Sequence, residues 1–508
     1  MMPTFPGKKI VLTSDQTMMS SYHGGVMLGF AAIMPERSLP DFVFHKLFCP
    51  PVPVAEDGSA ALAPCGMRKV EAALLEAGFS SDEVMVAHPL HLERAIGPDT
   101  RVVGITHDDP MGKIAVREIE DIIGQGAPFN RSKFLELLNH PLMRKYRPKV
   151  VLGGNGAWEA MGEKVSVDHI YLGEGESDFP EICRKIMAGE SVPPVIRGRA
   201  VPGEAIPSCQ GATIGGIVEI GRGCWRGCAF CSPTNRIMRH RPIGSILKDV
   251  RVNLEAGQND IILHSEDFFS YGYRGSGPDQ KMILDLVKAV KRQKPKTIDV
   301  SHLSLASVYQ NQELLRQVSE IVGVGSDQNH MSAWIGIESG SCRIMKMHMP
   351  NKARPADIED WSHIVQDCYS LFAEESWLPV ASLVLGLPGE RAEDVIKTTE
   401  LVESLMDYTG LMLPLFFTTI ADTKLGGSKG FSREDALPEH WQLVGLCLEY
   451  NLRHLKSLHR FYQERMTAGP GVHLALKGIN LLADIVLSKY MKRSEERRVG
   501  KECRSRWS

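Results

Sequence analysis

The sequence predicts an α/β protein with two parallel-sheet units in series: an N-terminal doubly wound parallel sheet, followed by a partial (β/α) barrel with a helical C-terminal segment. Two patterns predict this. Short apolar runs alternate with helical patterns from about residue 8 to residue 190, and six further strand–helix units lie between about 214 and 425. The chain has 508 residues, 43% of them hydrophobic, which is enough for more than one buried core.

The first unit, residues 1–195, is expected to hold buried parallel strands. A helix is predicted at 68–79, where RKVEAALLEAGF has apolar residues at helical spacing and ends near a glycine. Ligands of such sheets bind beyond the carboxyl ends of the strands. The strands are expected at KIVLTS (9–14), EVMVAHP (83–89), RVVGIT (101–106), KVVLGG (149–154) and HIYLGEGE (169–176).

The second unit, residues 214–425, follows a linker rich in Pro, Gly and Ala at about 191–213. Six strand–helix units fit a full or partial barrel, whose catalytic groups lie at the carboxyl ends of the strands. Helices are predicted at 280–292 and 392–406, and residues 426–492 form a helical C-terminal region. Strands are expected at 215–221, 260–267, 297–306, 332–339, 379–389 and 411–420.

The last sixteen residues, RSEERRVGKECRSRWS (493–508), resemble the read-through translation of a sequencing adapter and are excluded from the fold. The alternative is a basic disordered tail. The segment holds six basic and three acidic residues, so the rest of the chain carries a net charge of −6 rather than −3. The net negative charge of the rest of the chain does not favour binding to nucleic acid. On the adapter interpretation, the native C-terminus is expected to be missing.

The cysteines outside the tail fall into one cluster and seven scattered residues. Scattered cysteines do not form a disulfide framework and suit a reducing, cytoplasmic location. No apolar run is long enough to span a bilayer, so no transmembrane segment is expected. The scattered residues are Cys49, Cys65, Cys183, Cys209, Cys342, Cys368 and Cys447.

The cluster lies in VEIGRGCWRGCAFCSPTNR (218–236), where Cys224, Cys228 and Cys231 follow a C-x3-C-x2-C spacing directly after a predicted strand. Thiolates are soft ligands for iron–sulfur clusters or zinc. Three thiolates can hold three corners of a cubane and leave the fourth iron open, whereas a closed zinc site needs a fourth ligand. Gly223 and Gly227 allow a tight turn. A zinc loop stays the alternative.

This segment resembles the radical S-adenosylmethionine (SAM) superfamily, whose motif is CxxxCxxC with an aromatic residue before the third cysteine, here Phe230. WIGIESGS (334–341), LVLGLPGE (383–390) and LHSED (263–267) resemble strand ends of the family. The resemblance implies a 4Fe-4S cluster on the three cysteines and reductive cleavage of SAM to a 5′-deoxyadenosyl radical. It also implies SAM contacts at Glu266, Asp267, Glu338, Ser339 and Gly386.

The order of the two units resembles the cobalamin-binding class of radical SAM enzymes. VVLGGNGAW (150–158) is similar to the Gly-Gly turn of that class, and HIYLGEGESDFPEI (169–182) is similar to its G-E-G-E segment. The resemblance implies cobalamin contacts at Gly153, Gly154, Asn155, Glu174 and Glu176. The D-x-H-x-x-G signature of histidine-ligated cobalt is absent.

Two histidines lie in candidate loops of the first unit: His23 in SSYHGG (20–25) and His107 in THDDPMG (106–112). Neither has the spacing of a cobalt ligand, so each is interpreted as a polar loop residue. The segments at 12–30 and 64–79, together with the cysteine motif, also resemble archaeal membrane-lipid ring synthases and their uncharacterised relatives.

Three hypotheses follow for the function. The first is cobalamin-dependent methylation of an unactivated carbon. The second is non-methylating radical C–C bond formation on a lipid chain. The third, from another class, is a cobalamin- or metal-binding regulatory module without turnover. The enzyme hypotheses imply a small-molecule or lipid substrate and a reducing partner of the flavodoxin or ferredoxin type. No residue identifies the substrate.

Overall fold

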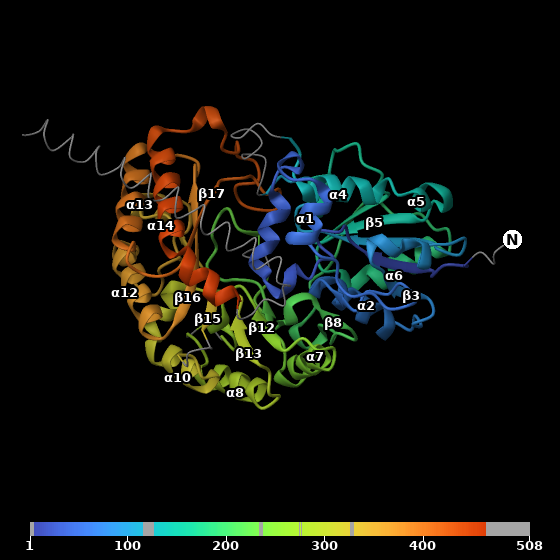
Figure 1. Cartoon of the computed structure of the whole chain (residues 1–508), viewed down its shortest axis with the longest axis horizontal. Coiled ribbons are helices and arrows are strands. Elements are labelled where there is room, and N and C mark those ends of the chain that lie inside the picture. Colours follow the sequence, from blue (N-terminus) through green and yellow to red (C-terminus); the bar gives the residue numbers. More distant parts are fainter. Residues whose placement is uncertain are drawn as a thin grey trace, which may run out of the picture.

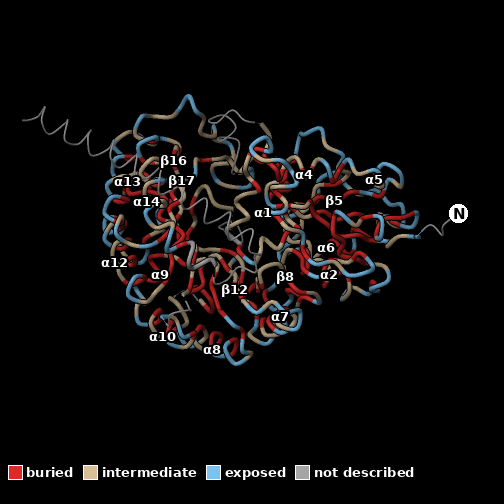
Figure 2. Tube along the Cα trace, viewed as in Figure 1, coloured by how far each residue is buried: buried red, intermediate tan, exposed pale blue. Residues whose placement is uncertain are grey.

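The computed structural model describes residues 5–114, 126–232, 237–273, 275, 277–325 and 330–463. Figure 1 shows two α/β parts, the N-terminal one in blue and cyan beside a larger one that runs from green to red. Each part has buried cores of its own, and their residues are red in Figure 2. The tail at 493–508 and the predicted helical region beyond residue 463 lie outside the described residues.

The N-terminal part is built on a six-stranded sheet in which every neighbouring pair is parallel. The chain runs from β1 outward to β3 on one side and then to β4 on the other, so the order of the strands reverses between β1 and β4. The sheet order is β3 (Val84–Val86), β1 (Ile10–Thr13), β4 (Val102–Thr106), β5 (Lys149–Gly153), β6 (His169–Leu172) and β7 (Val195–Arg197).

Helices cover both faces of this sheet because its strands are apolar on both sides. Alternate residues of β1 enter different cores: Ile10 and Leu12 join one, and Val11 joins the other. The first face carries α2 (Cys65–Glu76) and α6 (Gly175–Met187), and the second carries α4 (Phe129–Leu138) and α5 (Pro141–Tyr146). The predicted doubly wound sheet is therefore confirmed. Helix α1 (Asp41–Leu47) lies in a smaller cluster beside α4.

The larger part is a row of parallel strands that curves into a partial barrel. Its two ladders meet at Ser301, whose amide donates to Leu263 O (3.0 Å) and whose carbonyl accepts from the Trp334 amide (2.8 Å). The strand order is β9 (Ile217–Glu219), β12 (Asp260–His264), β13 (Thr297–Val300) with β14 (His302–Leu303), β15 (Met331–Glu338), β16 (Trp377–Leu385) and β17 (Leu411–Phe416).

Amphipathic helices surround these strands and enclose the largest core. The predicted helices at 280–292 and 392–406 are found as α8 and α13. The helices are α7 (Ile243–Glu255), α8 (Gln280–Lys291), α9 (Leu305–Gln310), α10 (Gln312–Val322), α11 (Cys342–His348), α12 (Trp361–Glu374), α13 (Ala392–Ser404) and α14 (Pro438–Gln463). None of the described helices combines the length and apolarity needed to cross a bilayer.

Alternate residues of the barrel strands differ in burial. In β12, Ile261 and Leu263 are fully buried against the helices, whereas Ile262 and His264 are partly exposed. In β15, Trp334 and Gly336 are partly exposed in the same alternation. Because successive side chains of a strand point to opposite faces, the partly exposed residues face the inside of the barrel. The barrel interior is therefore accessible near its carboxyl end.

The two parts contact each other directly. Strand β2 (Leu62–Ala63) of the N-terminal part pairs in parallel with β8 (Ala212–Thr213) of the linker. The short helix η2 (Val26–Ile33) brings Phe30 against Trp334 of β15, with ring centroids 5.4 Å apart.

Three predictions about elements were inaccurate at their ends. The strand predicted at 169–176 stops at Leu172, and Gly175 already begins α6. The strand predicted at 297–306 breaks at Ser301, and α9 begins at Leu305. The linker contains β7, which pairs with β6 at the sheet edge.

Candidate functional site

The three cysteines lie on a loop at the carboxyl end of the first barrel strand. The loop leaves β9 through the short strand β10 (Gly221–Arg222), which pairs with β11 (Arg239–His240). Gly223 and Gly227 have φ of +86° and +70°, a left-handed conformation that favours glycine. The Cys231 amide donates to Cys228 O at 3.2 Å, which closes a tight turn between these two cysteines.

Arg226 fastens this loop to the barrel. Its buried guanidinium donates to the carbonyl oxygens of Asn351, Lys352 and Arg354 at 3.0–3.3 Å and to Ser307 Oγ at 2.8 Å. It also stacks on the Trp225 ring at 4.7 Å from the centroid. The loop is therefore held in place by its own side chain, since charge-assisted bonds to several carbonyls fix one geometry.

Burial disfavours the thiolate form of all three cysteines. It raises the pKa of Cys224 to about 11 and that of Cys231 to about 12. It also raises the pKa of Cys228, and the charges of Lys352 and Arg226 make this rise smaller. Buried thiols of this kind become strong ligands only when a metal compensates the negative charge. Phe230 packs partly buried against the barrel core between the second and third cysteine.

The donor set fits an iron–sulfur cluster better than a single ion. Within the described ranges, no three His, Cys, Asp or Glu side chains gather closely enough to bind one metal ion. The cysteines of a cubane each bind a different iron and so lie farther apart than the ligands of one ion. Three soft thiolates on one loop, without a fourth protein ligand beside them, match that arrangement and disfavour the zinc alternative.

Glu338 ends β15 inside the barrel, in an ion pair with Lys352. Glu338 Oε1 lies 2.8 Å from Lys352 Nζ, and Glu338 Oε2 accepts from Ser382 Oγ at 3.1 Å. Both charged side chains are about nine-tenths buried, with 9% and 12% exposure. Burial lowers the pKa of Lys352, but Glu338 and Cys228 reverse that effect, and the net pKa is raised. Glu338 has φ +63°, a strained conformation for a non-glycine residue.

The bare Cα of Gly336 makes room for this pair. A Cβ there would lie 2.0 Å from Glu338 Oε1 and 2.5 Å from Lys352 Nζ. The β15–β16 register shifts between Gly336 and Glu338, as in a β-bulge, which turns the glutamate off the regular alternation.

Other residues predicted to contact SAM are engaged within the protein. Asp267 accepts from the Phe269 and Ser304 amides and from Ser270 and Ser307 hydroxyls, so its carboxylate is saturated.

Ser339 Oγ lies 3.3 Å from Thr398 Oγ1 on α13. The Gly386 amide donates to Glu390 Oε2 at 2.5 Å, and Phe431 lies where a Cβ on Gly386 would be. These contacts favour a supporting role for Asp267, Ser339 and Gly386.

Glu266 differs from them because it keeps a free oxygen. It lines a cavity of about 10 Å³, enough for one water molecule, beside Gly223 of the cysteine loop. Glu266 Oε2, Ser265 Oγ and His240 Nε2 are buried and have no hydrogen-bond partner among the described residues. Such atoms cost free energy unless a ligand or water satisfies them, so Glu266 is available to bind one.

A row of rings lies on neighbouring strands of the barrel, on their partly exposed inner side. His302 stacks on Trp334 at 6.2 Å and meets His264 edge-on at 5.9 Å between centroids. Both imidazole Nδ1 atoms lie 3.0 Å from Ser301 Oγ. Burial, followed by the charge of His264, lowers the pKa of His302 to about 4, so His302 is neutral at physiological pH.

In the N-terminal sheet, an ion pair lies where the strand order reverses. Asp15 follows β1 and His107 follows β4; Asp15 Oδ2 and His107 Nε2 are 2.5 Å apart. Burial raises the pKa of Asp15, but His107 and Thr17 outweigh it, and the net pKa is lowered. Ligands of doubly wound sheets bind beyond the carboxyl ends of the strands, at the point where the strand order reverses.

The Gly-Gly turn after β5 packs against the same loop. Gly154 has φ +95°, and a Cβ there would lie 2.5 Å from His107 O. Gly153 and Asn155 flank it, and Asn155 is exposed at the carboxyl edge of the sheet. Asp108, in the same loop, is exposed. The contact of Phe30 with Trp334 on β15 brings the N-terminal part against the barrel interior.

Glu159 is fully buried beneath this loop and accepts from the Met111 amide at 2.8 Å. Burial and the neighbouring Asp109 raise its pKa to about 9. In the folded protein Glu159 is therefore a neutral acid at pH 7.

Glu159→Gln should flatten the pH dependence of stability. The folded pKa of Glu159 is about 9, above the ordinary value of 4.5, so the unfolded chain ionises at lower pH than the folded protein. As the pH rises between these two values, the free energy of unfolding of the wild type falls by up to about 1.4 kcal/mol per pH unit. The variant has no carboxyl group at this position and should not show this fall. Urea unfolding at about pH 6 and about pH 8 measures it. Glu181→Gln, on the exposed face of α6, is the control. An unchanged slope in Glu159→Gln would contradict the prediction.

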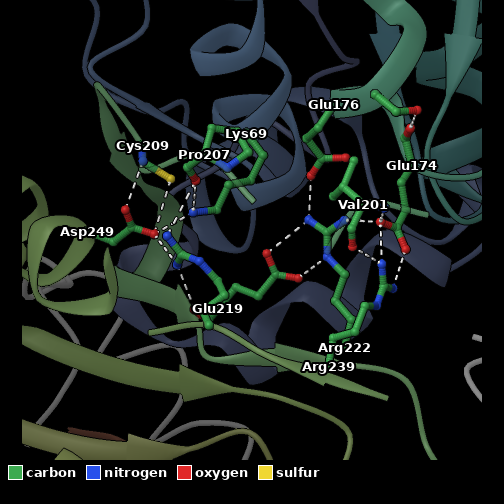
Figure 3. Close-up of polar contacts among 12 residues, drawn as sticks. Lys69, Glu174, Glu176, Val201, Pro207, Cys209, Glu219, Arg222, Arg239 and Asp249 are labelled. Atoms are coloured by element: carbon green, nitrogen blue, oxygen red, sulfur yellow. Dashed lines mark hydrogen bonds and ion pairs between the residues drawn. The ribbon is translucent and has the colours of Figure 1, made fainter. Parts of the chain in front are cut away.

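The predicted cobalamin contacts Glu174 and Glu176 lie elsewhere, in ion pairs with the barrel (Figure 3). Arg222, two residues before Cys224, pairs with Glu176 and Glu219 and lies 3.0 Å from Glu174 Oε2. Arg239 of β11 pairs with Glu174 at 2.5 Å. All these side chains are about nine-tenths buried. The two carboxylates therefore bind the base of the cysteine loop, and their role as cofactor contacts stays a prediction.

A second buried cluster lies beside the first in Figure 3. Asp249 of α7 pairs with Lys69 of α2 at 2.5 Å and with Arg241 at 2.7 Å, and it accepts from the Cys209 amide at 2.8 Å. The three charged side chains are no more than 1% exposed. One carboxylate thus joins a helix of the sheet, the linker and the barrel.

Several of these residues were missed by sequence reasoning. His264 and His302 lie within strands that were predicted, and a test for polar residues at inward positions could have found them. Asp15 lies two residues after β1, and the reversal of strand order marks this position only once the topology is known. No sequence pattern marked Lys352 as a site residue, because only the fold brings it close to Glu338.

No protein-family model matches the chain. The ribosomal protein uS12 methylthiotransferase RimO of Leptospira biflexa is 26% identical over 254 residues, 48% of this chain and 50% of that protein. The tRNA-2-methylthio-N(6)-dimethylallyladenosine synthase of Chlorobium limicola is 27% identical over 208 residues, 40% of this chain and 43% of that protein. The chain thus spans about half the length of the curated relatives it matches.

Among solved structures, the chain is similar to the radical SAM methyltransferase TsrM of Kitasatospora setae. With cobalamin and a 4Fe-4S cluster bound, TsrM matches with a TM-score of 0.53 at 15% identity, covering 82% of this chain and 77% of that one. With tryptophan and aza-SAM bound, the TM-score is 0.51. The predicted resemblance to radical SAM enzymes with a cobalamin-type N-terminal domain is therefore confirmed at the level of the fold.

Proposed function

We propose that this chain is a radical SAM enzyme whose 4Fe-4S cluster is held by Cys224, Cys228 and Cys231. The observation that carries the proposal is the position of this cysteine loop at the carboxyl end of the first barrel strand, in a chain that also carries a doubly wound sheet. The radical SAM methyltransferase TsrM, which has this fold, is described with a 4Fe-4S cluster, cobalamin and a SAM analogue.

When bound, the cluster supplies the electron that cleaves SAM to a 5′-deoxyadenosyl radical, and cobalamin supplies a methyl group. The residues of this chain bind and orient these groups. Phe230 packs behind the cysteine loop, and Glu266 offers its unpaired oxygen next to the loop. Glu338 faces the barrel interior, whereas Asp267, Ser339 and Gly386 hold the surrounding turns.

Cobalamin would lie between the sheet and the barrel, beyond the carboxyl ends of β1 and β4, which Asp15 and His107 follow. Gly153, Gly154 and Asn155 form the adjoining turn, and Gly154 and Asn155 are exposed there. The missing side chain of Gly154 lets the turn pack against His107, which fixes the exposed backbone that would contact the ring. His107 is engaged by Asp15 and by the Asp109 amide, so it does not supply a lower cobalt ligand. Glu174 and Glu176 contribute by holding the cysteine loop.

The reaction we propose is methylation of an unactivated carbon in a small-molecule or lipid substrate, with a flavodoxin- or ferredoxin-type reductant. Methylthio transfer is a second candidate, favoured by the names of the curated relatives. Non-methylating C–C bond formation on a lipid chain is a third. A cytoplasmic location is proposed with the reductant, since the cluster requires reducing conditions.

The test is anaerobic incubation of the reconstituted protein with SAM, cobalamin and a chemical reductant, with the products of SAM quantified. Both 5′-deoxyadenosine and S-adenosylhomocysteine should form, the latter only with cobalamin. Formation of 5′-deoxyadenosine alone would contradict methylation and favour the non-methylating chemistry. If neither product forms and the protein also lacks iron and sulfide, the proposal is overturned. The cobalamin- or metal-binding regulatory module would then be the remaining hypothesis.

A further inference from the structure

The Lys352–Glu338 pair lies near the cysteine that is most buried. Cys228 is 7% exposed, and its neighbours Arg226 and Ala229 are hydrogen-bonded to Lys352 O and His348 O. The pair occupies the space over Gly336 on the inner face of β15. A buried charge close to a redox centre is poorly screened by solvent and salt, so its effect on that centre is large.

The position of the ammonium is fixed from two sides. The backbone around Lys352 is bound to the cysteine loop, because the Lys352 carbonyl accepts from Arg226 at 3.0 Å and the Ala229 amide donates to His348 O at 2.7 Å. The ammonium itself is held by Glu338, whose second oxygen is held by Ser382. Neither charge can move away from the loop without breaking these contacts.

This ion pair is not expected to increase the stability of the fold. Two buried charges cost desolvation energy, and an apolar pair of similar volume often replaces them without loss. The strained φ of Glu338 adds a further cost. Such costs persist where the charges serve a site, and here the backbone of Lys352 is bound to the cysteine loop.

We propose that Lys352 stabilises the reduced state of the cluster bound at Cys228 and so raises its reduction potential, while Glu338 moderates this effect. The proposal rests on the proposed function, since it requires the cluster. Reduction adds one electron, supplied by the external reductant, and makes the cluster and its thiolates more negative. A nearby cation favours that state, and a nearby anion disfavours it.

The two charges therefore make opposite predictions. Lys352→Met removes the cation and leaves Glu338, so the midpoint potential should shift to more negative values. Glu338→Gln removes the anion and leaves Lys352, so the potential should shift to more positive values. The double variant should lie between the two, and Lys352→Arg, which keeps the charge, should stay near the wild type.

The measurement is an anaerobic redox titration of each reconstituted protein, without SAM, following the EPR signal of the reduced cluster. Lys429→Met is the matched control, because Lys429 pairs with Asp435 on the exposed surface and should leave the potential unchanged. Iron and sulfide content is measured on the same samples, so that only cluster-containing protein is compared.

Unchanged potentials in Lys352→Met and Glu338→Gln, or shifts of the same sign, would overturn the proposal. If Lys352 served only to bind the carboxylate of SAM, its loss would weaken SAM binding and leave the SAM-free potential unaltered, which is also a negative result. Failure of the proposed function is separable, because the wild type itself would then contain no cluster.

Discussion

Cys228→Ala should lose most of its iron and its visible iron–sulfur absorbance, and its cleavage of SAM should fall by at least about 100-fold. Loss of a direct ligand is expected to exceed the effect of losing an outer partner, which costs about 10–100-fold. Cys224 and Cys231 would remain, but two thiolates cannot hold three corners of a cubane. Iron and sulfide analysis and 5′-deoxyadenosine formation measure the effect.

The control is Cys183→Ala, which removes a thiol of similar burial from α6 in the core of the N-terminal sheet. It should retain iron and SAM cleavage. A Cys228→Ala protein with normal iron content and activity would contradict the assignment of the cluster. If both variants lost iron equally, the loss would report a general effect on folding, and the assignment would then depend on Cys224→Ala and Cys231→Ala.

Asp249→Asn should destabilise the protein by about 3–5 kcal/mol, the cost of leaving buried charges without their partner. The variant keeps the shape of the side chain but removes the charge that faces both Lys69 and Arg241, neither of which reaches solvent. Urea unfolding monitored by circular dichroism measures the loss. Part of the loss should appear in the contact between the sheet and the barrel, since Lys69 and Arg241 belong to different parts of the chain.

Asp285→Asn provides the comparison. Asp285 pairs with Lys281 at 2.7 Å on α8, but both side chains are largely exposed, and such pairs contribute little. The urea midpoint should stay where it is in the wild type. Equal midpoints for Asp249→Asn and the wild type would show that the buried cations find other partners, and the account of this cluster would be wrong.

The fold was predictable where it depends on local patterns. Strands β4 and β5 lie almost where their apolar runs placed them, and α8 and α13 begin at the predicted residues. Periodicity in one segment suffices for these elements. β7 was missed because its three residues are paired only at the sheet edge and lie in a segment whose prolines suggested a linker.

The site was predictable to a lesser extent. The cysteine loop follows from spacing alone, since its three ligands lie within eight residues. Glu174 and Glu176 were interpreted from a motif, but their partners Arg222 and Arg239 lie between 46 and 65 residues away and are brought near only by the packing of the two parts. Pairs of this kind leave no local pattern, and a single sequence therefore cannot reveal them.

The ion pairs around Arg222 also constrain how such a protein can change over generations. The barrel supplies Arg222, Arg239 and Glu219, and the N-terminal sheet supplies Glu174 and Glu176. If either half were replaced by that of a distant homologue, these buried arginines would face residues that do not match them, directly beneath the cysteine loop. A productive recombination would therefore have to carry both carboxylates together with the loop they hold.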